Sequence, residues 1–178
     1  GDEFTGVGIM KMNEGLDTGD ILLEEKIKIN NNDNLNTLSE KLSILSAKLF
    51  LNATSIIEEN INKNTNPQLI KQNTLGREIT YARMIEKSDF KVDWGNEAIK
   101  ISQKIKGLYP RTNTNFRGKN LKILKIKVLT SDVIKNEKYL FMSNYSRPGI
   151  ILAVIENEGI IISTKTDPII LLEAKLEG

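Results

Sequence analysis

Near its start the chain reads Thr5-Gly6-Val7-Gly8-Ile9-Met10-Lys11-Met12, and two residues later Gly15-Leu16-Asp17-Thr18-Gly19-Asp20-Ile21-Leu22. Residues 5–12 alternate around two apolar side chains, and residues 21–29 pass from an apolar run into alternation, so each stretch predicts a β-strand. Residues 13–20 are rich in Gly and Asp, which accept positive φ or hydrogen-bond their own backbone. The sequence therefore predicts two strands joined by a structured loop.

These two stretches together resemble the end of the catalytic domain of the formyltransferases. In that family a strand of the type T-G-V-x-I-M-x-M leads into G-L-D-T-G-D, and here the match is nearly complete. The later Val92-Asp93-Trp94 extends the resemblance along the chain. It points to the methionyl-tRNA formyltransferases, which transfer a formyl group from 10-formyltetrahydrofolate to the amino group of methionyl initiator tRNA in translation initiation.

Asp17 is the candidate catalytic residue. Formyl transfer to an amine passes through an oxyanion intermediate, and a carboxylate on a rigid loop can orient an imidazole and accept the amine proton. By resemblance, Asp17 matches the family's catalytic aspartate, which works with an asparagine and a histidine from an upstream segment of the type N-x-H-x-S-L-L-P. Residues 1–178 contain neither that segment nor any histidine. We therefore expect a truncated form with an incomplete folate pocket and little or no activity alone.

A long helix and a polar segment follow the second strand. Thr37 and Glu40 have the spacing of a capping box. Apolar residues then recur at steps of three and four, which predicts a helix that ends near Ile61 and covers a sheet: Leu38, Leu42, Leu45, Leu49, Ala53 and Ile56. The next stretch lacks periodicity. We expect residues 1–62 to be the carboxyl-terminal part of the catalytic domain, 63–82 a linker and 83–178 a carboxyl-terminal domain.

The carboxyl-terminal part predicts one helix and about five short strands. The helix opens at residues 93–96, places Ala98, Ile101, Ile105 and Leu108 on one face, and ends before Pro110. Strand patterns cover residues 121–128, 139–142, 149–155, 159–164 and 169–172, with a hairpin turn at 156–159. The expected fold class is an α/β remnant of a Rossmann-like formyltransferase domain, followed by an OB-like open β-barrel that binds tRNA.

The charge of the chain is strongly segregated. Residues 100–147 hold twelve Lys or Arg against Asp132 and Glu137, a balance of +10, whereas the whole chain carries only +2. Such a block favours a polyanion-binding face, although each lysine by itself could be an ordinary solvated charge. The residues that we expect to contact the tRNA backbone are Lys104, Lys106, Arg111, Arg117, Lys119, Lys122, Lys125 and Lys127.

The amino-acid composition argues against several kinds of site and against membrane association. The chain has no Cys and no His, which argues against disulfides and against a zinc or copper site, so we expect no metal. No apolar run approaches the roughly 20 residues that cross a bilayer, so we expect no membrane association. The sequence thus predicts a cytoplasmic monomer whose partners are initiator methionyl-tRNA and a folate.

Two other functions remain open at this point. Sugar-nucleotide N-formyltransferases share the G-x-D-T-G-D loop and also carry additional carboxyl-terminal domains. The basic segment disfavours that reading, because a nucleotide sugar offers only a few charges. The second alternative is a non-catalytic RNA-binding module that retains a vestigial catalytic segment. Formyl transfer after the addition of the missing part would distinguish an enzyme from such a module.

Overall fold

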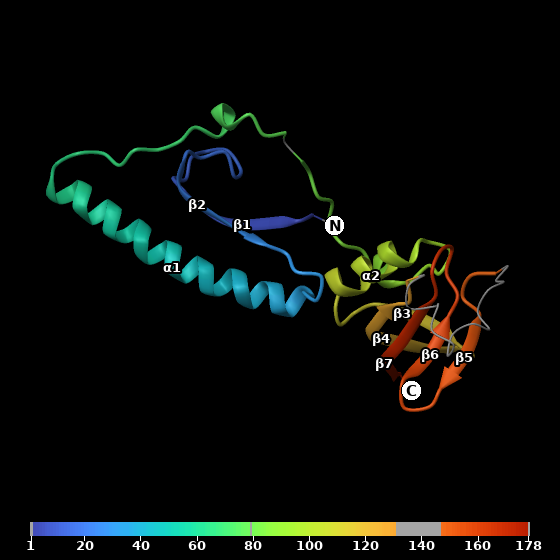
Figure 1. Cartoon of the computed structure of the whole chain (residues 1–178). Helices are drawn as coiled ribbons and strands as arrows, with labels where there is room; N and C mark the ends of the chain where they lie inside the picture. Colours follow the sequence, from blue (N-terminus) through green and yellow to red (C-terminus); the bar gives the residue numbers. More distant parts are fainter. Residues whose placement is uncertain (1, 79, 131–146, 178) are drawn as a thin grey trace. The chain divides into compact units, whose positions relative to one another are not determined.

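The computed structural model describes residues 2–78, 80–130 and 147–177. The chain divides into two compact units, Gly1–Arg83 and Met84–Gly178. Figure 1 shows the elements of both, and each unit has its own antiparallel sheet among the described residues. No helix in the described part of the chain is long and apolar enough to cross a membrane.

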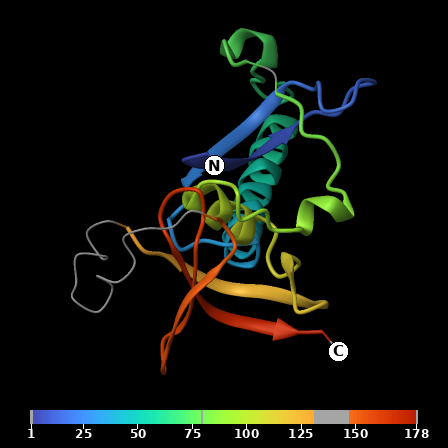
Figure 2. The same cartoon turned by 90° about the vertical axis from the view of Figure 1, so that its right-hand side faces the viewer.

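Unit 1 is a two-stranded ribbon covered on one face by a helix. The strands β1 (Phe4–Met10) and β2 (Ile21–Lys28) pair antiparallel, and α1 (Leu35–Asn62) runs along them in both Figure 1 and Figure 2. Leu45, Leu49 and Ala53 are buried, because the apolar stripe of the helix faces the ribbon. The two predicted strands and the helix with its apolar stripe are confirmed.

The cap of α1 differs from the prediction. The helix begins at Leu35, and the Asn34 side chain accepts hydrogen bonds from the backbone N–H groups of Asn36 and Thr37 at 3.0 and 3.1 Å. The Thr37 hydroxyl in turn accepts from the Asn34 backbone at 3.0 Å. The predicted box of Thr37 with Glu40 is therefore wrong. Asn is a stronger N-cap than Thr, so the helix starts one turn earlier.

Unit 2 contains the short 3₁₀ helix η2 (Lys87–Phe90), the helix α2 (Ala98–Gly107) and a five-stranded sheet. The sheet order is β3-β4-β7-β6-β5, with every neighbouring pair antiparallel. Its strands are β3 (Asn113–Phe116), β4 (Lys119–Val128), β5 (Ile151–Ile155), β6 (Gly159–Ile162) and β7 (Ile169–Leu176). Within the described residues the sheet is open, so the expected barrel is seen only as this sheet.

The strand predictions succeeded where alternation or a turn signal was present. The hairpin at 156–159 is confirmed, with Asn157 and Gly159 at φ of 61° and 147°. Strand β3 was missed, because Asn-Thr-Asn-Phe does not alternate. The turn after it is Arg117-Gly118 with φ of 51° and 81°, in which only the glycine favours positive φ, so the hairpin signal in the sequence is weak. The predicted strand at 139–142 lies outside the described residues.

Helix α2 packs on one face of the larger sheet. Ala98, Ile101 and Ile105 form a core with Ile123 of β4 and Ile169 of β7. The predicted apolar face of this helix is thus confirmed. A second, smaller cluster contains Leu129, Ile161 and Ile170. Since neighbouring residues of a strand point to opposite faces, Ile169 and Ile170 belong to different clusters and β7 contributes to both faces of the sheet.

Candidate functional site: the β1–β2 loop and the basic face of β4

The loop between β1 and β2 is closed by its own hydrogen bonds. The backbone N–H of Lys11 donates to the carbonyl of Asp20 at 2.9 Å. The Asn13 side-chain oxygen accepts from the backbone of Gly15 at 3.1 Å and from the Thr18 hydroxyl at 2.8 Å. The expected structured loop is therefore present, and Asn13 organises its first half.

Two glycines of the loop are needed for close approach. A Cβ added to Gly19 would lie 1.7 Å from the carbonyl oxygen of Lys11, a distance that no side chain can occupy. A Cβ on Gly15 would lie 2.2 Å from the Thr18 hydroxyl oxygen. The clash at Gly19 is with backbone and cannot be relieved by a side-chain movement, whereas at Gly15 the Thr18 side chain would have to turn away from Asn13.

Asp17 lies at the tip of this loop in a left-handed backbone conformation, with φ of 55°. Its side chain is exposed, and the neighbouring Leu16 is 91% exposed. A carboxylate that lies at the end of a buried strand is desolvated, and hydrogen bonds must balance that cost. In unit 1 the strands are only half-buried, and Gly19 is the buried residue of the described loop, so this desolvation is not observed.

Gln72 contacts the loop and was not anticipated from the sequence. Its side-chain amide donates to the carbonyl of Asp17 at 2.9 Å and to the carbonyl of Gly19 at 2.7 Å. The residue lies in the segment that the sequence predicts to be a linker, where no periodicity marked it. A contact between residues more than fifty positions apart leaves no local signal. Only the folded chain brings Gln72 to the loop.

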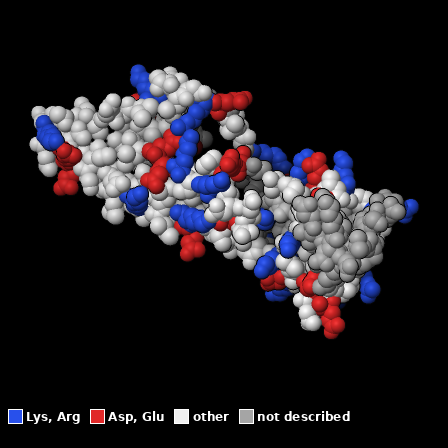
Figure 3. Space-filling view, viewed as in Figure 1, with Lys and Arg blue, Asp and Glu red and all other residues white. Residues whose placement is uncertain are grey.

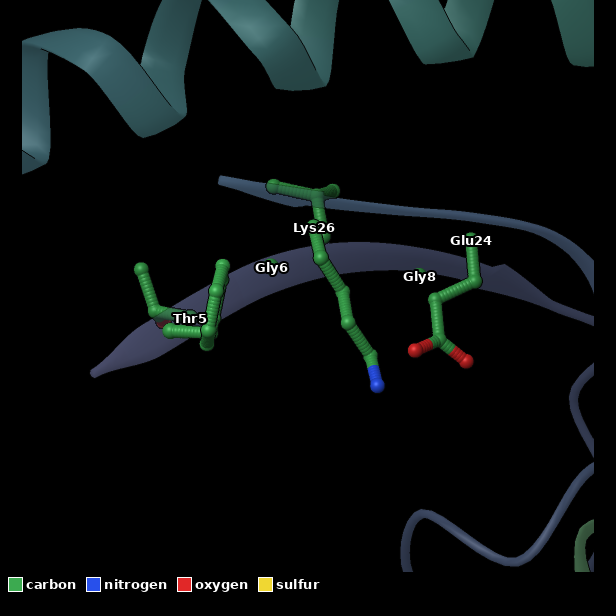
Figure 4. Close-up of a pocket in the computed structure, with 7 residues that line it drawn as sticks. Thr5, Gly6, Gly8, Glu24 and Lys26 are labelled. Carbon is green, nitrogen blue, oxygen red and sulfur yellow. The ribbon is translucent and has the colours of Figure 1, made fainter. Parts of the chain in front are cut away.

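The face of the ribbon that points away from α1 is hollowed. Figure 4 shows Glu24 and Lys26 projecting from this face beside Gly6 and Gly8. The absence of two side chains leaves a hollow of about 310 Å³, which is lined by Phe4, Thr5, Gly6, Val7, Gly8, Glu24 and Lys26. Asp17 does not line it, so the hollow and the loop are separate features.

Three of the predicted tRNA-contacting lysines share one face of β4. Leu124 has no partner in the pairing of β4 with β7, and this bulge shifts the alternation by one residue. Lys122, Lys125 and Lys127 therefore all lie on the face of the sheet opposite α2, although the first two are three residues apart. Regular alternation would have put Lys125 on the face covered by α2.

Carboxylates of β7 and the residue after it lie among these lysines. Glu173 is the register partner of Lys125, and Glu177 forms an ion pair with Lys122 at 2.5 Å. The hydrogen bond from Lys122, and next that from Asn120, lowers the pKa of Glu177 below its ordinary value. The charge balance of +10 for residues 100–147 does not include this neutralisation, because Glu173 and Glu177 lie some fifty positions further along the chain. In Figure 3, Lys and Arg are interspersed with Asp and Glu over the face in view.

The predicted residues of α2 belong to a different surface. Lys104 and Lys106 lie in its last turn, and the Lys104 ammonium donates to the Lys91 carbonyl at 2.8 Å. Helix α2 covers the core face of the sheet, whereas the lysines of β4 project from the other face. The structure therefore does not bring all eight predicted residues onto one surface.

The remaining three predicted residues lie near aromatic rings or turns. The Arg111 guanidinium is 5.5 Å from the centre of the Phe90 ring, and that of Arg117 is 5.3 Å from the Phe116 ring. Lys119 is the first residue of β4. A guanidinium over a ring keeps its charge while its position is restricted. Among the described residues, no group of three or more His, Cys, Asp or Glu could hold a metal ion.

Curated relatives match the chain over its full length. A methionyl-tRNA formyltransferase from Prochlorococcus marinus (strain MIT 9312) is 88% identical over 178 residues, which cover 100% of this chain and 54% of that protein. Two further relatives of that name from Prochlorococcus marinus, strains AS9601 and MIT 9215, are 87% and 85% identical over the same span. The chain thus spans about half the length of the curated relatives it matches.

Solved structures show the same fold at low sequence identity. HypX from Aquifex aeolicus in complex with tetrahydrofolic acid matches 99% of this chain and 28% of its own, with a TM-score of 0.64 and 14% identity. An N-formyltransferase from Helicobacter canadensis in complex with folinic acid and dTDP-3-aminofucose matches 96% of this chain and 56% of its own, with a TM-score of 0.61 and 21% identity.

Family models account for both units. The model described as "Formyl transferase" matches residues 1–54, and the model described as "Formyl transferase, C-terminal domain" matches residues 84–178. The second match alone covers unit 2 from its first residue to its last. Together with the G-L-D-T-G-D loop, these matches show that the chain belongs to the formyl transferase family.

Proposed function

We propose that the chain is part of a methionyl-tRNA formyltransferase, which transfers the formyl group of 10-formyltetrahydrofolate to the amino group of methionyl initiator tRNA. The observation that carries this proposal is the 88% identity, over all 178 residues, to a relative of that name. In the reaction the amine nitrogen bonds to the formyl carbon, the bond from that carbon to the folate nitrogen breaks, and the amine proton passes to the folate.

In this proposal Asp17 serves the proton transfer. Its carboxylate orients an imidazole and accepts or relays the proton that the attacking amine loses. The imidazole comes from the upstream N-x-H-x-S-L-L-P segment that the family resemblance implies. The exposed position of Asp17 in unit 1 is compatible with this role, because its partner side chains are not among residues 1–178.

We infer that unit 2 binds the tRNA backbone through an OB-like barrel that includes the five-stranded sheet. The domain bounds 63–82 for the linker and 83–178 for this domain stay a prediction. Lysine and arginine contacts to phosphates position the RNA without reading its bases, and salt weakens them. The eight predicted residues supply that charge from at least two surfaces, and Glu173 and Glu177 reduce it on β4.

The proposal is tested by completing the chain. The chain is joined to the part of the Prochlorococcus marinus relative that it does not span, and formyl transfer from 10-formyltetrahydrofolate is measured with two acceptors. We expect transfer to methionyl initiator tRNA and none to a dTDP-amino sugar. Transfer to the amino sugar alone would support the sugar-nucleotide alternative, and transfer to neither acceptor would support the RNA-binding module.

Binding by the chain itself provides a second measurement. The 178-residue chain should bind initiator tRNA with an affinity that falls as salt rises, because each neutralised phosphate releases counterions. A dTDP-sugar of low charge should bind with little salt dependence, if it binds at all. Absence of tRNA binding at low salt would contradict the assignment of unit 2 as the RNA-binding part.

A further inference from the structure

The side chain of Gln72 spans the loop that carries Asp17. Its Nε2 atom has two hydrogens, and both are used within the loop: one bond goes to the carbonyl of Asp17 at 2.9 Å and the other to the carbonyl of Gly19 at 2.7 Å. The two acceptors flank Thr18, so one amide group holds both sides of this residue. The same nitrogen lies 3.9 Å from the sulfur of Met10 at the end of β1.

The segment around Gln72 contacts β2 on both sides of this residue. Two residues earlier, Ile70 exchanges a pair of backbone hydrogen bonds with Ile21, each of 2.8 Å. Five residues later, the Arg77 guanidinium lies 2.8 Å from both carboxylate oxygens of Glu24. Gln72 itself begins the short 3₁₀ helix η1 (Gln72–Leu75) and is half-buried. Its amide is thus presented by a fixed segment.

Aspartate accepts the left-handed conformation more readily than most side chains, but negative φ remains the more favourable alternative, so a contact that holds Asp17 in this conformation affects where its carboxylate points. Here φ of Asp17 is 55°, and the carbonyl oxygen of Asp17 accepts the hydrogen bond from the Gln72 side chain. Without the hydrogen bond this carbonyl could turn toward water. Asp17 could then relax to negative φ, which would swing its carboxylate to a new direction.

We propose that Gln72 is a positioning residue for formyl transfer, holding Asp17 in its left-handed conformation and so aiming the catalytic carboxylate. This inference rests on the proposed function. Gln72 acts through Asp17 and does not itself touch the reacting atoms. It therefore affects the chemical step far more than the affinity for tRNA, since the predicted RNA contacts lie in unit 2.

The test uses the completed enzyme described above with Gln72→Met and Gln72→Glu. Methionine has a similar length without N–H donors, and glutamate has the same shape but turns a carboxylate toward two carbonyls. We expect kcat to fall about 10- to 100-fold, since misplacement of a catalytic group by about 1 Å costs that much, while KM for methionyl-tRNA changes little. Gln68→Met is the matched control, because Gln68 is exposed in the same segment.

A double-mutant cycle separates positioning from general damage. If Gln72 acts through Asp17, then Gln72→Met should lower kcat in the parent enzyme but have little further effect in Asp17→Asn. Unchanged kcat in Gln72→Met, or an equal fall in both backgrounds, would overturn the proposal. Equal unfolding midpoints of the parent and variant in urea exclude loss of the fold.

Amide hydrogen exchange, measured on the 178-residue chain alone, distinguishes failure of the positioning role of Gln72 from failure of the proposed function. Gln72→Met should speed amide exchange in residues 15–19 and leave α1 unchanged, whereas Gln68→Met should change neither. Failure of formyl transfer in the parent completed enzyme would remove the proposed function and with it the reaction that Gln72 serves. Unchanged exchange in the loop would instead refute the holding of Asp17 by Gln72.

Discussion

Gly149 lies against the indole of Trp94, so that a Cβ on the glycine would be 3.3 Å from Cδ1 of the ring. The glycine has φ of 84°. The ring in turn donates its N–H to the Thr114 hydroxyl at 3.1 Å and packs against the core that α2 covers. This contact ties the segment before β5 to the start of unit 2, and it can be tested by mutation.

Gly149→Ala should destabilise unit 2 more than Gly118→Ala. Both glycines are left-handed, with φ of 84° and 81°, so each alanine should cost about 1 kcal/mol in backbone strain. Only the Gly149 variant also presses a methyl group on Trp94, since nothing lies within 4 Å of a Cβ on Gly118. Urea unfolding followed by the fluorescence of this single tryptophan measures both. Equal losses would show that the indole moves aside freely.

Gly19→Ala should disrupt the loop. Because the added Cβ would lie 1.7 Å from the Lys11 oxygen, the strand ends must separate, at a cost of about 1–3 kcal/mol. Urea unfolding followed by helical circular dichroism, to which α1 contributes more residues than α2, gives the comparison. Gly8→Ala is the control, since its nearest neighbour would be at 3.9 Å and the change should be nearly neutral. A neutral Gly19→Ala would contradict the close approach.

Asp17→Asn should lower the kcat of the completed enzyme by orders of magnitude while leaving tRNA affinity nearly unchanged, because an amide cannot accept the proton. Steady-state formylation and equilibrium tRNA binding are measured together. Glu14→Gln removes a neighbouring exposed carboxylate of the same loop and should leave kcat close to the parent value. Similar activity of both variants would exclude Asp17 from the mechanism.

Replacing Lys122, Lys125 and Lys127 together by Ala should weaken tRNA binding and reduce its salt slope by about 1 for each lysine that contacts a phosphate. Because Lys122 is paired with Glu177, Lys122 should contribute the least of the three lysines to the change in salt slope. Salt titrations of tRNA binding provide the measurement. The matched control removes three exposed lysines of unit 1, with the same loss of charge: Lys26, Lys63 and Lys71. Equal slopes for both triple variants would place the binding surface elsewhere.

Asp33→Asn should destabilise the start of α1 at neutral pH but not in acid. The hydrogen bond from Lys41, and next that from the Asn30 backbone, lowers the pKa of Asp33 below 3.8. Its contribution is therefore complete above 3.8 and is lost as pH falls through the lower pKa of the folded state. Thermal melting of the parent and variant should differ at about pH 7 and converge at about pH 2. A constant difference would contradict this pair.

Local patterns were sufficient for much of the fold. The leucine stripe of α1, the apolar face of α2 and the turn at 156–159 each lie within one continuous segment, so periodicity and turn chemistry revealed them. The family followed from a contiguous motif, G-L-D-T-G-D between two strands. The start of α1 was misplaced because two capping pairs overlapped and only backbone geometry chooses between Asn34 and Thr37.

The sequence by itself determined the identity of the loop, its glycines and the candidate carboxylate, since residues that act on their own backbone leave a local trace. Only the tertiary structure brought Gln72 to Asp17 and Glu173 to Lys125, and only a bulge at Leu124 put three lysines on one face. These relationships join residues about fifty positions apart or depend on strand register. Their free energy comes from pairing between distant segments, which no local pattern of side chains records.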